Sequence, residues 1–230
     1  MAANLEVVGS ENGLAVLYFH GAASVRDFGP SDELCIRSGI RLFRFCRPGY
    51  DNSAARPSAS LIDVAEDALS ILVSMGIESV VVLGWSGGGP YALASVFAKT
   101  HIVSKVGLIA SWAPMSPPDP GLPGGVRFFM KAAQVLSRPL LRVALAATGR
   151  RTAGHVDDIR RVARPWGFAI SELPSSPPVH AWHATNDPNV PIGPWRNQST
   201  ITLHEHSGNW HETSEPVWEE IFDWAKSLSA

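Results

Sequence analysis

A serine set among glycines is the residue of this chain best suited to covalent chemistry. Ser86 occurs in Gly84-Trp85-Ser86-Gly87-Gly88, directly after the apolar run 79–83 and at the start of an alanine-rich segment. A serine on a sharp turn from a buried strand into a helix needs neighbours with almost no side chain, because its backbone lies against both elements. The motif therefore predicts that Ser86 is a nucleophile; an ordinary glycine-rich turn is the simpler alternative.

A serine hydroxyl becomes a nucleophile only beside a base, and that base needs an orienting acid. Asp187 follows the apolar run 179–184, and His211 lies between a short final strand and the closing helix. Each has a structural alternative, because Asp187 could be a turn residue and His211 a surface loop residue. The order Ser86, Asp187, His211, each after a predicted strand, nevertheless predicts a nucleophile, an orienting acid and a general base.

Two histidines near the final strand compete with His211 for the role of base. His204 and His206 belong to or border that strand, whose side chains point across the sheet, whereas a base must reach over the strand end. His204 with His206, or His180 with His183, could also bind zinc by their spacing. No carboxylate or cysteine completes a recognisable ligand set in the sequence. We therefore expect no metal and no other cofactor.

Backbone groups beside the nucleophile are expected to receive the negative charge of a reaction intermediate. Ala22 follows the first buried strand in His20-Gly21-Ala22, and Gly87 follows the nucleophile. Their two N–H groups predict an oxyanion hole. Trp85 and Trp112 stand at strand ends, where they could line an apolar acyl or alcohol pocket; core packing is the ordinary alternative for tryptophan.

Short apolar runs that alternate with helical patterns must position these residues. Strands separated by helix-length connections form parallel sheets with helices on both faces. The fold class predicted is therefore α/β, with a mostly parallel, doubly wound sheet. The predicted strands are 5–8, 14–19, 40–45, 79–83, 106–110, 179–184 and 201–204, and the predicted helices are 60–75, 87–99 and 215–228.

Residues 115–178 interrupt this alternation. The segment is rich in proline and glycine at both borders, with helical patterns at 126–147 and 156–163 between them. Inserts of this kind between two core strands usually lie over one end of the sheet. We expect a small helical cap inserted between the strand near 106–110 and the strand near 179–184.

Composition excludes several classes of protein. The chain has 230 residues, a net charge of −2 and two cysteines, Cys35 and Cys46. A length of 230 residues suits one domain, 1–230. The charge balance gives no basic surface for nucleic acid, and two cysteines make no disulfide scaffold. Without a signal-peptide pattern or an apolar run long enough to span a bilayer, we expect a cytoplasmic protein that acts on a small molecule.

Five matching pieces give the chain a family resemblance. The sequence resembles the serine-nucleophile branch of the α/β-hydrolase superfamily, the small bacterial esterase and peptidase-like kind. The resemblance implies a Ser-His-Asp triad, a cap over the active site and hydrolysis of an ester, amide or thioester bond. The matching pieces are His20-Gly21, Arg47-Pro48-Gly49-Tyr50, Gly84-Trp85-Ser86-Gly87-Gly88-Gly89-Pro90, Trp182-His183-Ala184-Thr185-Asn186-Asp187 and Trp210-His211.

The resemblance also sets two further expectations. Family members usually begin with a strand hairpin, whereas only residues 5–8 precede the strand at 14–19, so the N-terminal edge strands should be shortened or missing. Because Ser86, Asp187 and His211 are all present, a serine esterase that acts on a small apolar substrate is favoured. The alternative is a non-catalytic binding or signalling protein on the same fold.

Overall fold

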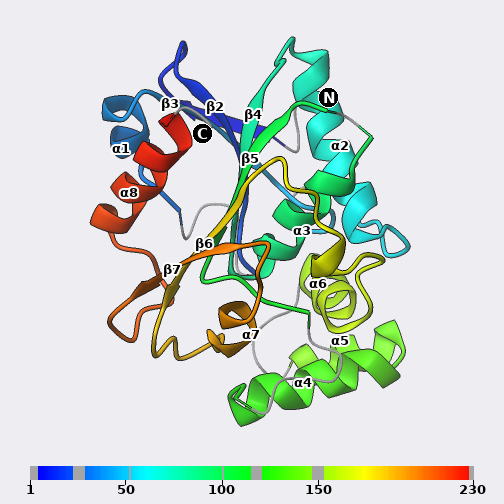
Figure 1. Cartoon of the computed structure of the whole chain (residues 1–230). Coiled ribbons are helices and arrows are strands. Elements are labelled where there is room, and N and C mark those ends of the chain that lie inside the picture. The colour runs from blue at the N-terminus through cyan, green and yellow to red at the C-terminus, as the bar shows by residue number, and fades with distance from the viewer. Residues whose placement is uncertain are drawn as a thin grey trace.

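Seven strands form one central sheet in the order β1-β3-β2-β4-β5-β6-β7 (Figure 1). The computed structural model describes residues 5–22, 29–51, 53–99, 101–114, 121–146 and 153–227. All neighbouring strands are parallel except β1, which runs antiparallel to β3 and forms the N-terminal edge. The strands are β1 (Leu5–Gly9), β2 (Leu14–Phe19), β3 (Ile40–Phe45), β4 (Val80–Trp85), β5 (Val103–Ile109), β6 (Val179–Ala184) and β7 (Thr202–His206).

The strand order changes direction between β2 and β4. From β2 the chain moves outward to β3, and from β4 it moves in the opposite sense through β5, β6 and β7. Connections leave such a switch point on opposite faces of the sheet, which opens a crevice at the carboxyl ends of the strands. Ser86 follows β4 and Ala22 lies beyond β2, so both residues lie at this switch point.

Alternating side chains along the strands build two separate cores. Leu17 and Phe19 pack on one face with α2 (Leu61–Ser74) and α3 (Gly89–Ala94). Val16 and Tyr18 pack on the other face, whose core includes residues of α1 (Asp32–Arg37) and α8 (Glu215–Lys226). Because both faces are covered, the strands are apolar on both sides, and the doubly wound α/β sheet predicted from the sequence is confirmed.

Helix boundaries differ from the sequence prediction where capping signals are weak. Ser60 caps α2 in a reciprocal hydrogen-bond pair with Asp63, so this start agrees with the prediction. The segment predicted as one helix, 87–99, is instead a 3₁₀ turn (Ser86–Gly88), α3 and a second 3₁₀ turn (Ser95–Phe97). The short helices α1 and α7 (Gly193–Arg196) were not predicted.

Three helices lie between β5 and β6, in the segment for which we propose the role of a cap. They are α4 (Gly124–Val135), α5 (Arg138–Ala146) and α6 (Ala153–Ala163), followed by the 3₁₀ turn η3 (Ile170–Glu172). The pattern predicted at 126–147 divides before Pro139, which lacks an N–H donor and suits a helix start. Residues of α4, α5 and α6 share a small core of their own, and α4 and α5 lie outermost in Figure 1. No helix within the described ranges is long and apolar enough to cross a bilayer.

Candidate active site

Ser86 lies in a tight turn between β4 and the following helix, in a backbone conformation that side chains rarely adopt. Its φ angle is 51°, in the left-handed region. The flanking glycines leave room for this turn, because a Cβ on Gly84 would lie 2.6 Å from the carbonyl oxygen of Gly88. A Cβ on Gly88 would in turn lie 2.0 Å from the Phe19 carbonyl oxygen, so the turn packs directly against the end of β2.

A continuous chain of hydrogen bonds connects Ser86, His211 and Asp187. The Ser86 hydroxyl lies 2.9 Å from Nε2 of His211, and Nδ1 of His211 lies 2.9 Å from Oδ2 of Asp187. Because the carboxylate accepts from Nδ1–H, Nε2 of a neutral ring carries the lone pair and accepts the serine proton. The three residues predicted as nucleophile, base and acid are therefore brought together in an arrangement suited to proton transfer.

Main-chain donors hold the Asp187 carboxylate in place. Its Oδ1 accepts hydrogen bonds from the N–H groups of Asn189, at 2.8 Å, and Val190, at 3.0 Å. His183, which sequence reasoning did not select for the site, is buried beside it, with Nε2 3.0 Å from the Val190 carbonyl oxygen and 3.4 Å from Asp187 Oδ2. Burial lowers the pKa of His183, although the Val190 carbonyl and Asp187 oppose this. The ring is therefore neutral at pH 7 and donates from Nε2 to Val190.

Two tryptophans contact the Ser86–His211 pair through their indole N–H groups. Trp85 is buried and donates to the His211 carbonyl oxygen at 2.9 Å, which holds the loop that carries the base. Trp112 is half-buried after β5 and donates to the Ser86 hydroxyl oxygen at 3.2 Å. The sequence left core packing and a pocket-lining role open for both residues, and the pocket-lining role stays a prediction.

The two predicted oxyanion donors lie next to each other. A Cβ built on Gly87 would lie 3.4 Å from the backbone nitrogen of Ala22 and 3.3 Å from its Cβ. A Cβ on Gly21 would meet the Trp85 ring at 2.3 Å, so the loop after β2 is pressed against the turn that carries Ser86. Ala22 and Gly87 therefore lie side by side, and their role as oxyanion donors stays a prediction.

The competing histidines lie elsewhere. His204 and His206 contact the Glu220 carboxylate of α8 at 3.5 and 3.4 Å, and His180 Nδ1 lies 2.9 Å from His204 Nε2. Of the three rival bases, His211 is the one placed at Ser86. Within the described ranges, no group of three or more histidine, cysteine or acidic residues is arranged to hold a metal ion.

Comparison with known proteins places the chain in a family. The alpha/beta hydrolase family matches residues 16–220, which is most of the chain. The chain belongs to the alpha/beta hydrolase family. None of the curated proteins matches it.

Solved structures of other alpha/beta hydrolases and esterases share the fold. An esterase from Exiguobacterium antarcticum, EaEST, has 17% identity and a TM-score of 0.68, with 97% of this chain and 95% of that chain covered. An enol-lactonase from Burkholderia xenovorans LB400 has 14% identity and a TM-score of 0.71, with 96% and 95% covered. The esterase RhEst1 from Rhodococcus sp. ECU1013 has 18% identity and a TM-score of 0.64, with 98% and 94% covered. At these identities the likeness is one of fold.

This alpha/beta hydrolase also contains a buried ion pair that sequence reasoning missed. Arg47, after β3, has no exposed side-chain surface and donates through Nε to Oδ2 of Asp158, on α6, at 3.0 Å. The only sequence signal was Arg47 itself, in one of the pieces that carry the family resemblance. Asp158 lies 111 positions further along the chain, and nothing local marks it as its partner.

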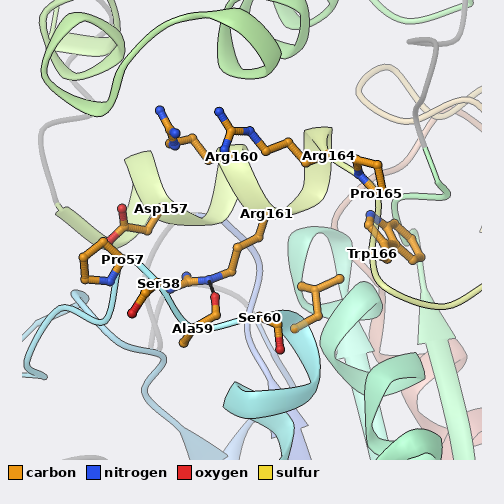
Figure 2. A pocket seen from close by; sticks show the side chains of 11 residues that line it. Pro57, Ser58, Ala59, Ser60, Asp157, Arg160, Arg161, Arg164, Pro165 and Trp166 are labelled. Atoms are coloured by element: carbon orange, nitrogen blue, oxygen red, sulfur yellow. Dashed lines mark hydrogen bonds between the residues drawn. The ribbon is translucent and has the colours of Figure 1, made fainter.

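A separate cavity lies beside α6 (Figure 2). Its volume is about 230 Å³, and its lining includes residues 57–61 and Arg161 but none of Ser86, Asp187 and His211. Figure 2 shows Arg161 reaching from α6 to Ala59, whereas Arg160 and Arg164 extend from the opposite side of the helix. This cavity is therefore separate from the candidate active site around Ser86.

Proposed function

We propose that this alpha/beta hydrolase is a serine esterase that forms an acyl-enzyme on Ser86. The observation that carries the proposal is the hydrogen-bond chain from the Ser86 hydroxyl through His211 to Asp187, with both links to the imidazole at 2.9 Å. Hydroxyl nucleophiles are activated by this combination of an adjacent base and an orienting acid.

The chemistry follows from the positions of the atoms. His211 Nε2 takes the hydroxyl proton as Ser86 Oγ bonds to the carbonyl carbon of the ester, whose oxygen becomes negative. The N–H groups of Ala22 and Gly87 stabilise that oxygen. When the intermediate collapses, the carbon–oxygen bond to the alcohol breaks and His211 protonates the departing alcohol.

Hydrolysis of the acyl-enzyme repeats these steps with water as the nucleophile. His211 removes a proton from water, the hydroxide oxygen attacks the acyl carbon, and the bond to Ser86 Oγ breaks. His211 then returns the proton to Oγ and the carboxylic acid leaves. The Trp112 indole N–H, 3.2 Å from Oγ, is placed to stabilise the serine oxygen as it leaves.

The substrate class that we propose is a small, apolar carboxylic ester in the cytoplasm. The esterases among the fold neighbours support ester over amide or thioester, which the same residues could attack. The half-buried Trp112 offers an apolar ring beside the nucleophile. Two free and buried thiols, Cys35 and Cys46, fit a reducing compartment.

A panel of p-nitrophenyl esters of graded acyl length tests the proposal. We expect turnover of the shorter esters and inactivation by a serine-reactive phosphonate. We also expect an initial burst of nitrophenol where deacylation is slower than acylation. Ser86→Ala should lower kcat by about 10⁴-fold or more. Ser95→Ala is the matched control, because Ser95 is buried at the far end of the same helical segment and its hydroxyl donates to the nearby carbonyl oxygen of Ala92.

Two outcomes would overturn the esterase proposal. Wild-type turnover by Ser86→Ala would exclude Ser86 as the nucleophile. Failure of the wild-type protein both to hydrolyse any ester of the panel and to react with the phosphonate would favour the alternative of a non-catalytic binding or signalling protein on the hydrolase fold.

A further inference from the structure

A buried network of charged and polar groups joins α6 to the loop beside Ser86. The guanidinium of Arg47 is bound on one side by the Asp158 carboxylate, which is 2% exposed. On the other side Nη1 donates to the carbonyl oxygen of His20, and Nη2 donates to the carbonyl oxygen of Gly21 at 3.0 Å. One side chain therefore connects the proposed cap to two successive carbonyl groups of the loop that follows β2.

The Gly21 carbonyl belongs to the same peptide unit as the N–H group of Ala22. A trans peptide is planar, and its C=O and N–H point in opposite directions. A donor that holds the Gly21 oxygen therefore also fixes the direction of the Ala22 N–H, away from Arg47. Because the Ala22 nitrogen lies beside Gly87, that direction determines whether both N–H groups can meet one oxyanion.

We propose that Arg47, oriented by Asp158, is a positioning residue that aims the Ala22 N–H at the oxyanion formed on Ser86. The inference rests on the proposed esterase function and adds to it a link between α6 and the oxyanion hole. A hydrogen bond from a cation to the carbonyl also polarises the peptide unit, which makes its N–H a stronger donor.

His20 supports the same carbonyl. The Arg47 backbone N–H donates to its Nε2 at 3.3 Å, so Nδ1 of the neutral ring carries the proton and donates to the Gly21 carbonyl oxygen at 2.7 Å. Burial and the neighbouring Arg47 hold the pKa of His20 well below its usual value, although Asp158 and the Gly21 carbonyl oppose them. The ring therefore stays neutral, and two donors restrain the Gly21 oxygen.

Asp158 is itself held by three further donors, two from other segments and one from α6. Tyr50 donates to Oδ2 at 2.8 Å, Tyr91 of α3 donates to Oδ1 at 2.5 Å, and Arg161 approaches Oδ1 to 3.4 Å. Burial alone would raise the pKa of Asp158, but the charge and hydrogen bonds of Arg47 and the Tyr91 hydroxyl lower it below its usual value. The carboxylate is thus ionised and fixed, as an orienting group must be.

The backbone of α6 is anchored at the same place. The Gly154 N–H donates to the Gly49 carbonyl oxygen at 3.0 Å, and a Cβ on Gly154 would meet the Tyr50 ring at 2.4 Å. Arg161 adds a hydrogen bond of 2.7 Å from Nε to the Ala59 carbonyl oxygen, drawn in Figure 2. These contacts keep Asp158 at a fixed distance from Arg47.

Paired substitutions can separate positioning from folding. Arg47→Met/Asp158→Asn removes both charges together, which avoids leaving one of them buried without its partner and retains an acceptor for the tyrosines. We expect a folded protein with kcat lower by about 10²-fold and KM nearly unchanged, since loss of one oxyanion donor has an effect of this size. Arg47→Lys keeps the charge but not the forked donor geometry, so we expect a drop in kcat of about tenfold.

Lys105→Met is the matched control. Lys105, on β5, is also a buried cation that donates to main-chain carbonyls. Its acceptors are Trp224 and Ser227, near the C-terminus, and not groups beside Ser86. Its loss should lower the melting temperature and leave kcat unchanged.

A transition-state mimic supplies a readout that simple structural damage would not move. An alkyl boronic acid forms a tetrahedral adduct on the serine, and its Kd should rise by the factor by which kcat/KM falls across wild type, Arg47→Lys and the double variant. The affinity for the carboxylic acid product should stay constant.

The positioning role is overturned if either variant, with wild-type circular dichroism and a cooperative melting transition, keeps kcat within threefold of wild type or changes KM alone. Arg47→Lys decides the question if the double variant does not fold. Ser86→Ala, measured in the same assay, tests the esterase proposal separately. Inactive Ser86→Ala beside fully active Arg47 variants would reject only the positioning role.

Discussion

The backbone conformation of Ser86 predicts that glycine is more stable than alanine at this position. A φ of 51° costs an ordinary L-residue about 1–2 kcal/mol, and glycine is free of this cost. We therefore expect Ser86→Gly to be more stable than Ser86→Ala. Both variants lose the hydroxyl, and with it the contacts to His211 and Trp112, so their difference isolates the backbone contribution.

The size of that difference follows from two opposing contributions. Relief of the left-handed strain stabilises Ser86→Gly by about 1–2 kcal/mol. The greater freedom of glycine in the unfolded chain destabilises it by about 0.5–1 kcal/mol. The net gain of Ser86→Gly over Ser86→Ala should be about 1 kcal/mol. For a chain of 230 residues this corresponds to a rise in Tm of about 2–4 °C.

Chemical and thermal denaturation of the two variants measure this difference directly. Ala94→Gly is the control, because Ala94 has an ordinary helical φ of −60° and the same chemical change should destabilise it by about 1 kcal/mol. Opposite signs at the two positions are expected. If Ser86→Gly proved no more stable than Ser86→Ala, the strain at the nucleophile would not exist and the reasoning from φ would be refuted.

Three further changes test the site and its surroundings. Asp187→Asn should lower kcat by about 10⁴-fold in ester hydrolysis, because an amide favours the wrong imidazole tautomer; a loss below tenfold would contradict this role. Trp112→Phe keeps an aromatic ring but removes the donor to Ser86 Oγ, and single-turnover deacylation should slow by about 3–10-fold, the value of one hydrogen bond. Burial, His204 and Lys105 lower the pKa of His180 from 6.5 to about 4. Between pH 6.5 and 4 the unfolded chain therefore binds a proton at this histidine that the folded chain does not. The free energy of unfolding should consequently fall as the pH decreases through this range, by at most about 1.4 kcal/mol per pH unit. Urea unfolding of His180→Asn should show a flatter pH dependence than wild type, and an unchanged slope would exclude this contribution.

The features predicted from the sequence are those that depend on local backbone requirements. The turn around Ser86 needs Gly84 and Gly88, because a side chain at either position would collide with backbone atoms. Asp187 and His211 could be selected because the carboxyl ends of parallel strands meet at one edge, so their order along the chain limits what they can contact. The α2 boundary was predictable from Ser60 for the same local reason.

Contacts between distant segments could not be predicted in this way. The pairing of Arg47 with Asp158 spans 111 positions, and the indole contact of Trp112 with Ser86 depends on the path of the chain after β5. Tertiary packing decides which polar groups are buried, and the local periodicity of a sequence does not reveal it. The boundaries inside the predicted helix 87–99 were also missed, because no side chain caps the start of α3 or of the 3₁₀ turn that follows it.

The groups around Ser86 are each restrained by main-chain contacts from a different part of the core. Asn189 and Val190 hold the acid, Trp85 holds the loop of the base, and Arg47 holds the peptide unit of Ala22. Two further contacts reach this site from the segment between β5 and β6. Trp112, the donor to Ser86 Oγ, packs against the small core that α4, α5 and α6 share, and Asp158 of α6 binds Arg47. Substitutions in the shared core of α4 and α5 should consequently change the rate of a bound ester only through Trp112, whereas substitution of Asp158 should change it through Arg47 and the Ala22 peptide unit.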